Sequence, residues 1–269
     1  MPRCKYRHAD AIRTPFQAFS RCKDSQTYAY RMNIIVRNIP NFITCLNVAS
    51  GCAAILCATH AGEAWGGLEY YQWAYLFIAL AAVADFCDGL SARALGAYFP
   101  LGKELDSLCD LVSFGVAPAV LVYQCAAAGG ADAWLGWCAI LIPVAGALRL
   151  ARFNIDDRQT TTFIGLPIPA NAIFWIGFTA MGFDSASGLP GGEWVWLAII
   201  VLESWMMLAP VPMVSLKLKN FSIRQNWSRY LLVAVAIVCV VWLGLPGLAW
   251  LIVYYVASSV IAACVEAKR

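Results

Sequence analysis

Apolar residues fill most of this chain in a series of long runs, and short polar segments separate the runs. Each run approaches the ~20 residues that an α-helix needs to cross the hydrocarbon core of a bilayer. The pattern predicts spans at about 41–59, 69–97, 104–128, 134–154, 167–183, 194–216, 228–244 and 246–264. The fold class that we expect is all-α, a polytopic transmembrane helical bundle of about eight spans.

The N-terminal segment departs from this pattern. Residues 1–37 are polar and basic, and they contain no early apolar run of the kind that marks a secretory signal peptide. We expect residues 1–31 to be disordered or to lie on a membrane surface, and Met32 is an alternative start. The predicted division is therefore 1–37 for this segment and 38–266 for a transmembrane domain.

Composition and charge placement agree with a membrane protein. The 269 residues are 61% hydrophobic and 13% charged, about half the charged fraction of a soluble protein. All 19 Lys and Arg residues lie before the first span, after the last, or at and beside the links between spans two and three, four and five, and six and seven. Because basic loops stay in the cytoplasm, we expect an even number of spans and both termini in the cytoplasm.

Four carboxylates interrupt the apolar pattern where the second and third predicted spans meet. Asp85 and Asp88 are three residues apart, and Asp106 and Asp110 are four apart, so each pair shares one helix face. Charge is costly beside or inside a membrane span and therefore points to a functional site. An all-oxygen ligand set suits Mg²⁺ or Mn²⁺ better than zinc or copper. The alternative is that these charges only pair with one another between helices.

The residues after Asp88 suit a phosphate ligand. Gly89 and Ala92 remove side-chain bulk and permit close approach of another helix or of a ligand. Arg93 adds a fixed positive charge. A divalent cation beside an arginine is suited to binding a pyrophosphate.

The whole stretch resembles a known family. From Asp85 it reads D-F-C-D-G-L-S-A-R, then eight residues, then G-K-E-L-D-S-L-C-D. It resembles the signature D-x₂-D-G-x₂-A-R-x₈-G-x₃-D-x₃-D of the CDP-alcohol phosphatidyltransferases at every fixed position. The resemblance implies a site for two Mg²⁺ or Mn²⁺ ions that binds the CDP pyrophosphate. It implies that the metal ligands are Asp85, Asp88, Asp106 and Asp110, that Asp110 is also the general base, and that Gly89, Ala92 and Arg93 line the nucleotide.

Residues 102–119, 147–154 and 163–172 resemble the serine-using branch of this family. This resemblance implies transfer of the phosphatidyl group of CDP-diacylglycerol to L-serine, which gives phosphatidylserine and CMP in phospholipid biosynthesis. It also implies a homodimer in the bacterial cytoplasmic membrane, in contact with membrane lipids. The placement of Lys and Arg leads us to expect that the active site faces the cytoplasm. Nothing in the sequence indicates a nucleic-acid partner.

Two other functions remain open at this stage. The same chemistry could use glycerol 3-phosphate or an inositol phosphate as acceptor, because Arg149, Arg152 and Arg158 could hold an extra phosphate. A metal or solute transporter is a remote alternative from another class. It would place the carboxylates near the bilayer midplane and would show related halves of the sequence.

Several polar residues outside the aspartate motif are further candidates. Arg149 and Arg152, with Asn154, could bind the acceptor carboxylate or a lipid phosphate, or they could only anchor the helix at the membrane surface. Asn41 and Thr44 could contact the nucleotide, or they could cap the N-terminus of the first span. We expect Glu203, which is mid-span, to bond to a neighbouring helix as a protonated carboxyl.

Overall fold

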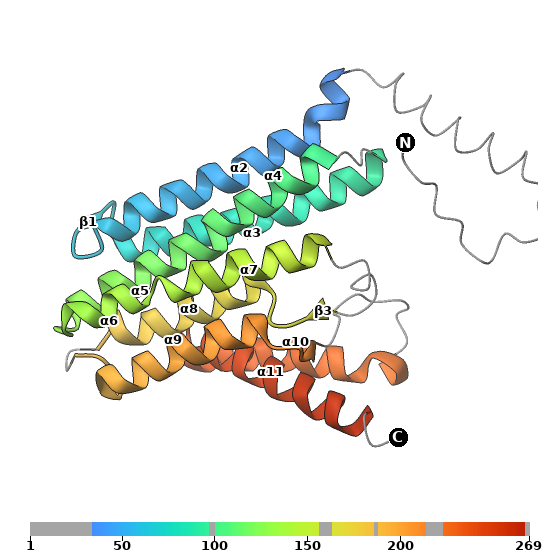
Figure 1. The fold of residues 1–269 in the computed structure, drawn as a ribbon. Coiled ribbons are helices and arrows are strands. Elements are labelled where there is room, and N and C mark those ends of the chain that lie inside the picture. The colour runs from blue at the N-terminus through green and yellow to red at the C-terminus, as the bar shows by residue number, and fades with distance from the viewer. Residues whose placement is uncertain (1–33, 97–99, 156–162, 186–187, 214–222, 267–269) are drawn as a thin grey trace, which may run out of the picture.

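The computed structural model describes residues 34–96, 100–155, 163–185, 188–213 and 223–266. The described chain is mostly helical, as the apolar pattern predicts (Figure 1). Its helices are α2 (Ile34–Thr59), α3 (Tyr70–Leu95), α4 (Pro100–Asp110), the π-helix η2 (Leu111–Val116), α5 (Ala117–Ala128), α6 (Ala133–Cys138), α7 (Leu141–Ile155), α8 (Ile168–Phe183), α9 (Gly192–Leu208), α10 (Ile223–Leu243) and α11 (Gly247–Glu266). The predicted segment 1–31 and Met32 lie outside the described residues.

Strands are minor elements that close loops at the two ends of the bundle. Strand β1 (Ala64–Trp65) pairs with β2 (Leu68–Glu69) in the turn between α2 and α3. Strand β3 (Phe163–Ile164) pairs with β4 (Pro212–Met213), which ties the start of α8 to the segment after α9.

Five helical stretches are long and apolar enough to cross a membrane. They are Asn38–Thr59, Tyr70–Leu95, Leu101–Ala128, Ala133–Ile155 and Gly247–Cys264. The helices Ile168–Phe183 and Leu231–Leu243 are apolar but shorter. The structure therefore supports a polytopic membrane protein with five candidate spans among the described residues, while the count of eight stays a prediction.

One predicted helix boundary was wrong. Helix α9 ends at Leu208, not near residue 216, because Pro210 and Pro212 restrict the backbone and cannot donate helical hydrogen bonds. Helix α2 begins at Ile34 and carries Pro40 in its interior, and its apolar stretch Asn38–Thr59 corresponds to the first predicted span.

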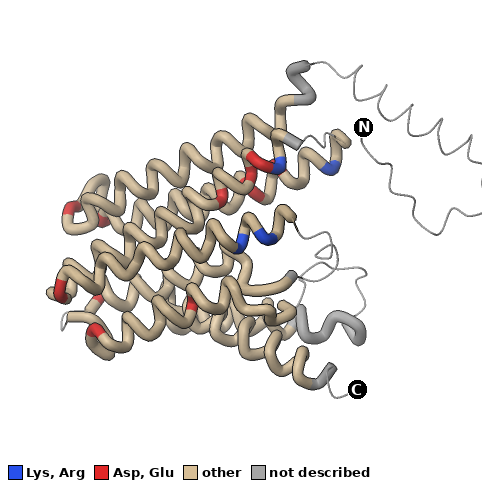
Figure 2. Tube along the Cα trace, in the orientation of Figure 1, with Lys and Arg blue, Asp and Glu red and all other residues tan. Residues whose placement is uncertain are grey.

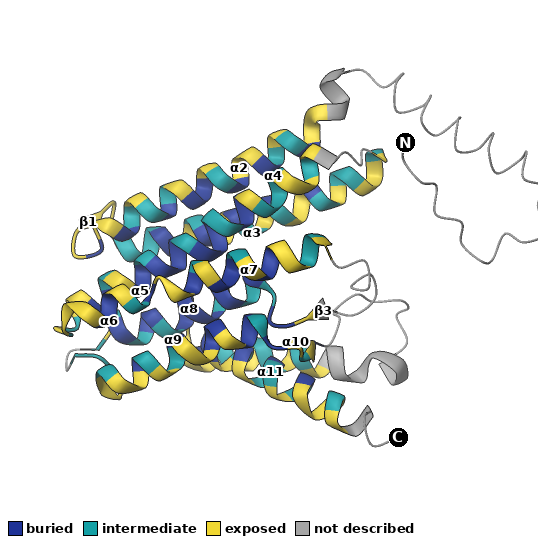
Figure 3. Cartoon of the chain, in the orientation of Figure 1, coloured by how far each residue is buried: buried dark blue, intermediate teal, exposed yellow. Residues whose placement is uncertain are grey.

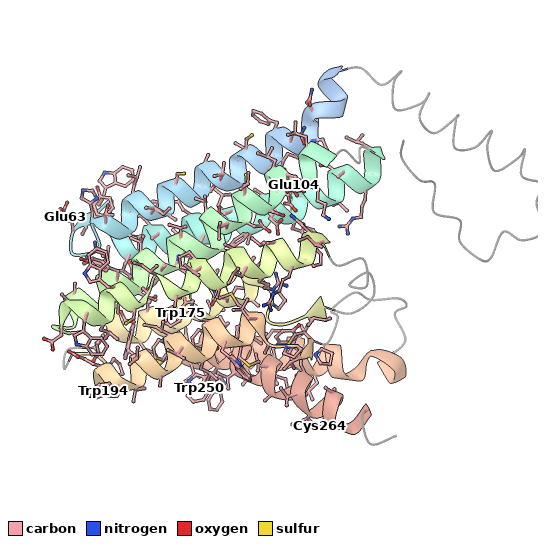
Figure 4. All side chains as sticks on the ribbon, viewed as in Figure 1. Glu63, Glu104, Trp175, Trp194, Trp250 and Cys264 are labelled. Carbon is pink, nitrogen blue, oxygen red and sulfur yellow. The ribbon has the colours of Figure 1, made fainter. Side chains whose placement is uncertain are left out.

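The helices pack so that buried side chains meet along the centre of the bundle (Figure 3). Helix α2 packs along α3 and also against α4, η2 and α5, while α8 packs against α5 and α11. Phe114, Trp175 and Trp196 are among the largest fully buried side chains, and Figure 4 shows Trp175 between the ribbons. Large apolar residues such as Phe86 and Trp242 point outward instead, as a lipid-facing surface requires.

Charge is distributed unevenly along the bundle. Lys and Arg of the described residues gather at the end where α2 begins and α11 ends (Figure 2). The acidic group carried by α3 and α4 lies toward the same end, away from the β1–β2 turn.

Candidate metal centre

Three of the four predicted aspartates form one group. Asp85 and Asp88 project from the C-terminal half of α3, and Asp106 projects from α4. One carboxylate oxygen from each lies within 4.8 Å of the others, although 18 residues separate Asp88 from Asp106 in the chain. The predicted meeting of the two helix faces is therefore observed for these three residues.

The group fits a divalent cation. Asp88 is buried, and the Asp85 and Asp106 carboxylates are close enough to share a hydrogen bond. Asp106 Oδ1 is buried and has no hydrogen-bond partner in the described part of the chain. Carboxylates held this close repel one another unless a cation or a proton intervenes. Oxygen donors of this kind are those that Mg²⁺ and Mn²⁺ prefer.

Asp110 lies beside this group but is not one of the three. It is the last residue of α4, is 8% exposed, and precedes the π-helix η2 directly. Its charge interacts with those of Asp85 and Asp106. Single-turn π segments in helical proteins are frequent at functional sites, where they redirect the side chains around them.

Thr44 bonds to one of the grouped carboxylates. Its hydroxyl lies 2.5 Å from Asp88 Oδ2 and 3.0 Å from the carbonyl oxygen of Pro40. Because Thr44 lies in the interior of α2, the alternative that it caps the helix N-terminus is wrong. The structure brings Thr44 to the carboxylate group, and its contact with the nucleotide stays a prediction.

Asn47 is a residue of this centre that the sequence analysis missed. Its Nδ2 donates a hydrogen bond of 3.1 Å to Asp110 Oδ1, and both side chains are buried. The signal was available, because Asn47 follows Thr44 by three residues and therefore shares its helix face. Asn47 was not predicted because the residues on either side of it in the sequence are apolar.

The other predicted nucleotide residues lie on α2 and α3, the helices that carry Thr44 and Asp88. Gly89 has open space where a Cβ would be, Ala92 is half-buried, and the Arg93 side chain is exposed. Asn41 Nδ2 donates to Asn38 Oδ1 at 3.3 Å, which also places Asn41 inside α2 and not at its N-terminal cap.

Gly102 of the aspartate motif has a local reason to be glycine. A Cβ at this position would lie 3.1 Å from Asn41 Oδ1, so the glycine lets α4 pass close to α2. The sequence pattern alone does not indicate this role for Gly102.

The predicted acceptor residues Arg149 and Arg152 differ in their surroundings. Arg149 on α7 is 7% exposed, and its Nε has no hydrogen-bond partner among the described residues. Its charge interacts with that of Asp110 and with Tyr255 on α11. Arg152 is exposed and donates to the carbonyl oxygen of Leu208 at 3.2 Å, at the C-terminal end of α9.

Asn154 connects the end of α7 to α4. Its Nδ2 donates to Ser107 Oγ at 3.0 Å, and its backbone carbonyl accepts from Lys103 Nζ at 3.0 Å. Asn154 Oδ1 is buried without a partner in the described chain. These contacts hold the helix that carries Arg149 against the helix that carries Asp106.

Glu203 does not make the interhelical bond that we expected. It is buried on α9 and makes no hydrogen bond to any described residue, and its Oε2 is fully enclosed. Glu203 lies within α9, as the sequence predicts, but the expected partner is missing from the described part of the chain, and its mid-span position stays a prediction.

Acidic ligands for a divalent cation, gathered at one end of a helical membrane bundle, define a class of membrane-embedded metal-dependent enzymes. Within this class, residues 37–216 match the family model of the CDP-alcohol phosphatidyltransferases, and the chain belongs to that family. The predicted resemblance is thereby confirmed.

Individual relatives agree with this assignment. A CDP-diacylglycerol–serine O-phosphatidyltransferase of Mycobacterium leprae is 33% identical over 216 residues, which cover 77% of this chain and 67% of the relative. An enzyme of the same name from Bacillus subtilis is 40% identical over 132 residues, covering 48% of this chain and 70% of the relative. An archaetidylserine synthase of Methanothermobacter thermautotrophicus is 37% identical over 149 residues, covering 55% and 60%.

Proposed function

We propose that this chain transfers the phosphatidyl group of CDP-diacylglycerol to L-serine and forms phosphatidylserine and CMP. The observation that carries the proposal is the convergence of Asp85, Asp88 and Asp106, the first three aspartates of the family signature, within 4.8 Å. The names of the matching relatives support serine as the acceptor.

The divalent ions would be held by all four aspartates. Asp85, Asp88 and Asp106 form the close group, and Asp110 completes the set beside it. Two ions, Mg²⁺ or Mn²⁺, would neutralise the pyrophosphate oxygens and stabilise the leaving CMP. Gly89, Ala92 and Arg93 on α3 and Asn41 and Thr44 on α2 would line the nucleotide.

Asp110 would act as the general base. The serine hydroxyl oxygen forms a bond to the phosphorus that carries diacylglycerol, while the bond from that phosphorus to the CMP oxygen breaks. The hydroxyl proton passes to Asp110. Of the acceptor candidates Arg149, Arg152 and Asn154, we assign the serine carboxylate to the buried guanidinium of Arg149.

We propose direct in-line attack without a covalent enzyme intermediate. Two hydroxyl groups near the aspartates already donate elsewhere, Thr44 to Asp88 and Ser113 to the carbonyl oxygen of Asn47. Sequential kinetics are expected, and a ping-pong pattern would contradict direct attack.

We further propose eight spans with both termini in the cytoplasm of a bacterium, and a centre that faces the cytoplasm from the inner membrane. The location of Lys and Arg at one end of the bundle supports this orientation (Figure 2). We also propose that the chain works as a homodimer in contact with membrane lipids.

CMP release by purified protein in detergent tests the reaction. Serine, glycerol 3-phosphate and inositol phosphate are supplied separately with CDP-diacylglycerol and Mn²⁺ or Mg²⁺, and Asp110→Asn is the control. Serine-dependent release that is lost in Asp110→Asn is the expected result. Release with another acceptor alone would identify that acceptor as the substrate in place of serine. No release from folded protein would favour a transport or structural role for the aspartates.

A further inference from the structure

Helix α2 presents two polar side chains to the aspartates, and each contacts a different one. Thr44 donates to Asp88 on α3, and Asn47, three residues later, donates to Asp110 at the end of α4. Both donors and both acceptors are buried. Residues three apart on a helix share a face, so one turn of α2 contacts both predicted metal-binding helices.

Asn47 is held at its side chain by Asp110 and at its backbone by Ser113. An ionised carboxylate only accepts hydrogen bonds, so Nδ2 and not Oδ1 of Asn47 must face Asp110. Ser113 Oγ, on the π-helix that follows Asp110, donates to the backbone carbonyl of Asn47 at 3.0 Å. Gly51 lets this approach occur, because a Cβ there would lie 2.8 Å from Ser113 Cα.

This arrangement makes the two oxygens of Asp110 unequal. Oδ1 accepts the hydrogen bond from Asn47, whereas Oδ2 accepts none from any described residue. A charge-assisted bond in a buried place restricts rotation of the carboxylate about its χ2 angle. The hydrogen bond to Oδ1 therefore also fixes the orientation of Oδ2.

We propose that Asn47 is a positioning residue that holds Asp110 Oδ1 and thereby aims Oδ2 at the acceptor hydroxyl. The inference rests on the proposed function, in which Asp110 takes the serine proton. The serine oxygen bonds to phosphorus, the phosphorus–CMP bond breaks, and the proton moves to the oxygen that Asn47 leaves free. Thr44 has a different task, because it holds Asp88, which has no part in the proton transfer.

The test compares steady-state kinetics and Mn²⁺ binding among variants of the two α2 residues. Asn47→Leu keeps the size of the side chain and removes the donor, Asn47→Ala removes it without added bulk, and Asn47→Gln keeps a donor. Thr44→Val is the matched variant on the same helix face. Free Mn²⁺, measured by electron paramagnetic resonance, reports binding in the absence of turnover.

The expected result is a loss of kcat in Asn47→Leu and Asn47→Ala of about 10- to 100-fold. KM for both substrates should stay near wild type, and Asn47→Gln should recover part of the loss. Mn²⁺ binding should fall less than in Thr44→Val, because Asp110 lies outside the close group of three carboxylates. Thr44→Val should instead weaken Mn²⁺ binding and recover activity at high Mn²⁺. If Asn47→Leu does not fold in detergent, Asn47→Ala decides.

Two results would overturn the inference. One is a wild-type kcat in Asn47→Ala, and the other is a change in Mn²⁺ binding that matches Thr44→Val, which would make Asn47 only a support of the metal centre. The Asp110→Asn control distinguishes failure of the proposed general-base function from failure of the role proposed for Asn47. If Asp110→Asn stays active, the general-base assignment fails, but if it is inactive while Asn47→Ala is not, only the role of Asn47 fails.

Discussion

Asn171 on α8 donates a 3.3 Å hydrogen bond to the carbonyl oxygen of Phe114, in the π-helix directly after Asp110. Asn171 is fully buried, and its Oδ1 accepts a 2.9 Å bond from Trp175 Nε1. The amide thus satisfies one acceptor and one donor that have no access to water. It connects a helix far along the chain to the backbone that carries the proposed general base.

Replacing this amide should weaken the fold. Asn171→Leu keeps the volume but leaves the Phe114 carbonyl and the Trp175 indole unpaired, and a buried unpaired group costs about 1–3 kcal/mol. We expect a lower thermal unfolding midpoint in detergent and reduced activity. The control is Ser258→Ala, which removes a hydroxyl that bonds only within its own helix, to Tyr255. Equal midpoints for the two variants would contradict a supporting role for Asn171.

The close approach of α2 and η2 predicts a second sensitive position. At Gly51 an added Cβ would lie 2.8 Å from Ser113 Cα and closer still to Ser113 Oγ. Gly51→Ala should therefore separate the two helices, lower the unfolding midpoint and reduce kcat. Gly62→Ala is the matched control, because nothing lies within 4 Å of a Cβ there. A Gly51→Ala variant as stable and active as wild type would show that the helices can separate without consequence.

Gly89 should behave in the opposite way to Gly51. No atom lies within 4 Å of a Cβ at Gly89, and alanine is favoured over glycine in a helix interior by about 0.5–1 kcal/mol. Gly89→Ala should therefore leave stability intact or raise it, while KM for CDP-diacylglycerol increases because the methyl group occupies the nucleotide position. An unchanged KM would remove Gly89 from the proposed nucleotide site.

The sequence allowed the aspartate pairs to be placed together because helical spacing and the reversal of direction between spans need no tertiary information. It did not reveal Asn47, since an asparagine between apolar neighbours in a membrane helix reads as an isolated polar residue. The same holds for Asn171, whose partner is a backbone carbonyl that no side-chain pattern encodes. The π-helix at Leu111–Val116 is equally invisible, because its residues fit an ordinary apolar helix.

Metal binding should be measurable as stabilisation. In wild type, Mn²⁺ at 100 times its Kd should stabilise the fold by about 2.7 kcal/mol. Asp106→Asn removes one of the three convergent carboxylates, so this stabilisation should largely disappear. The metal-free variant should be at least as stable as wild type, because one like charge is removed. Asp132→Asn, at an exposed position before α6, is the control and should respond to Mn²⁺ as wild type does.

Arg149 should determine affinity for the acceptor. Its guanidinium is buried, has an unpartnered Nε in the described part of the chain, and interacts with the charge of Asp110. Arg149→Met keeps an unbranched apolar stem and removes the charged donors. If these donors hold the serine carboxylate, at about 1.5–3 kcal/mol for a charged hydrogen bond, KM for serine should rise by roughly 10- to 100-fold.

Arg152→Met provides the contrast, because Arg152 already donates to the Leu208 carbonyl at the end of α9. Its removal should lower the unfolding midpoint more than it changes KM for serine. An increase in KM for CDP-diacylglycerol in Arg149→Met, with serine unaffected, would instead assign Arg149 to the lipid phosphate. Equal effects of the two substitutions on both substrates would mean that neither arginine contacts the acceptor and that both anchor α7 at the membrane surface.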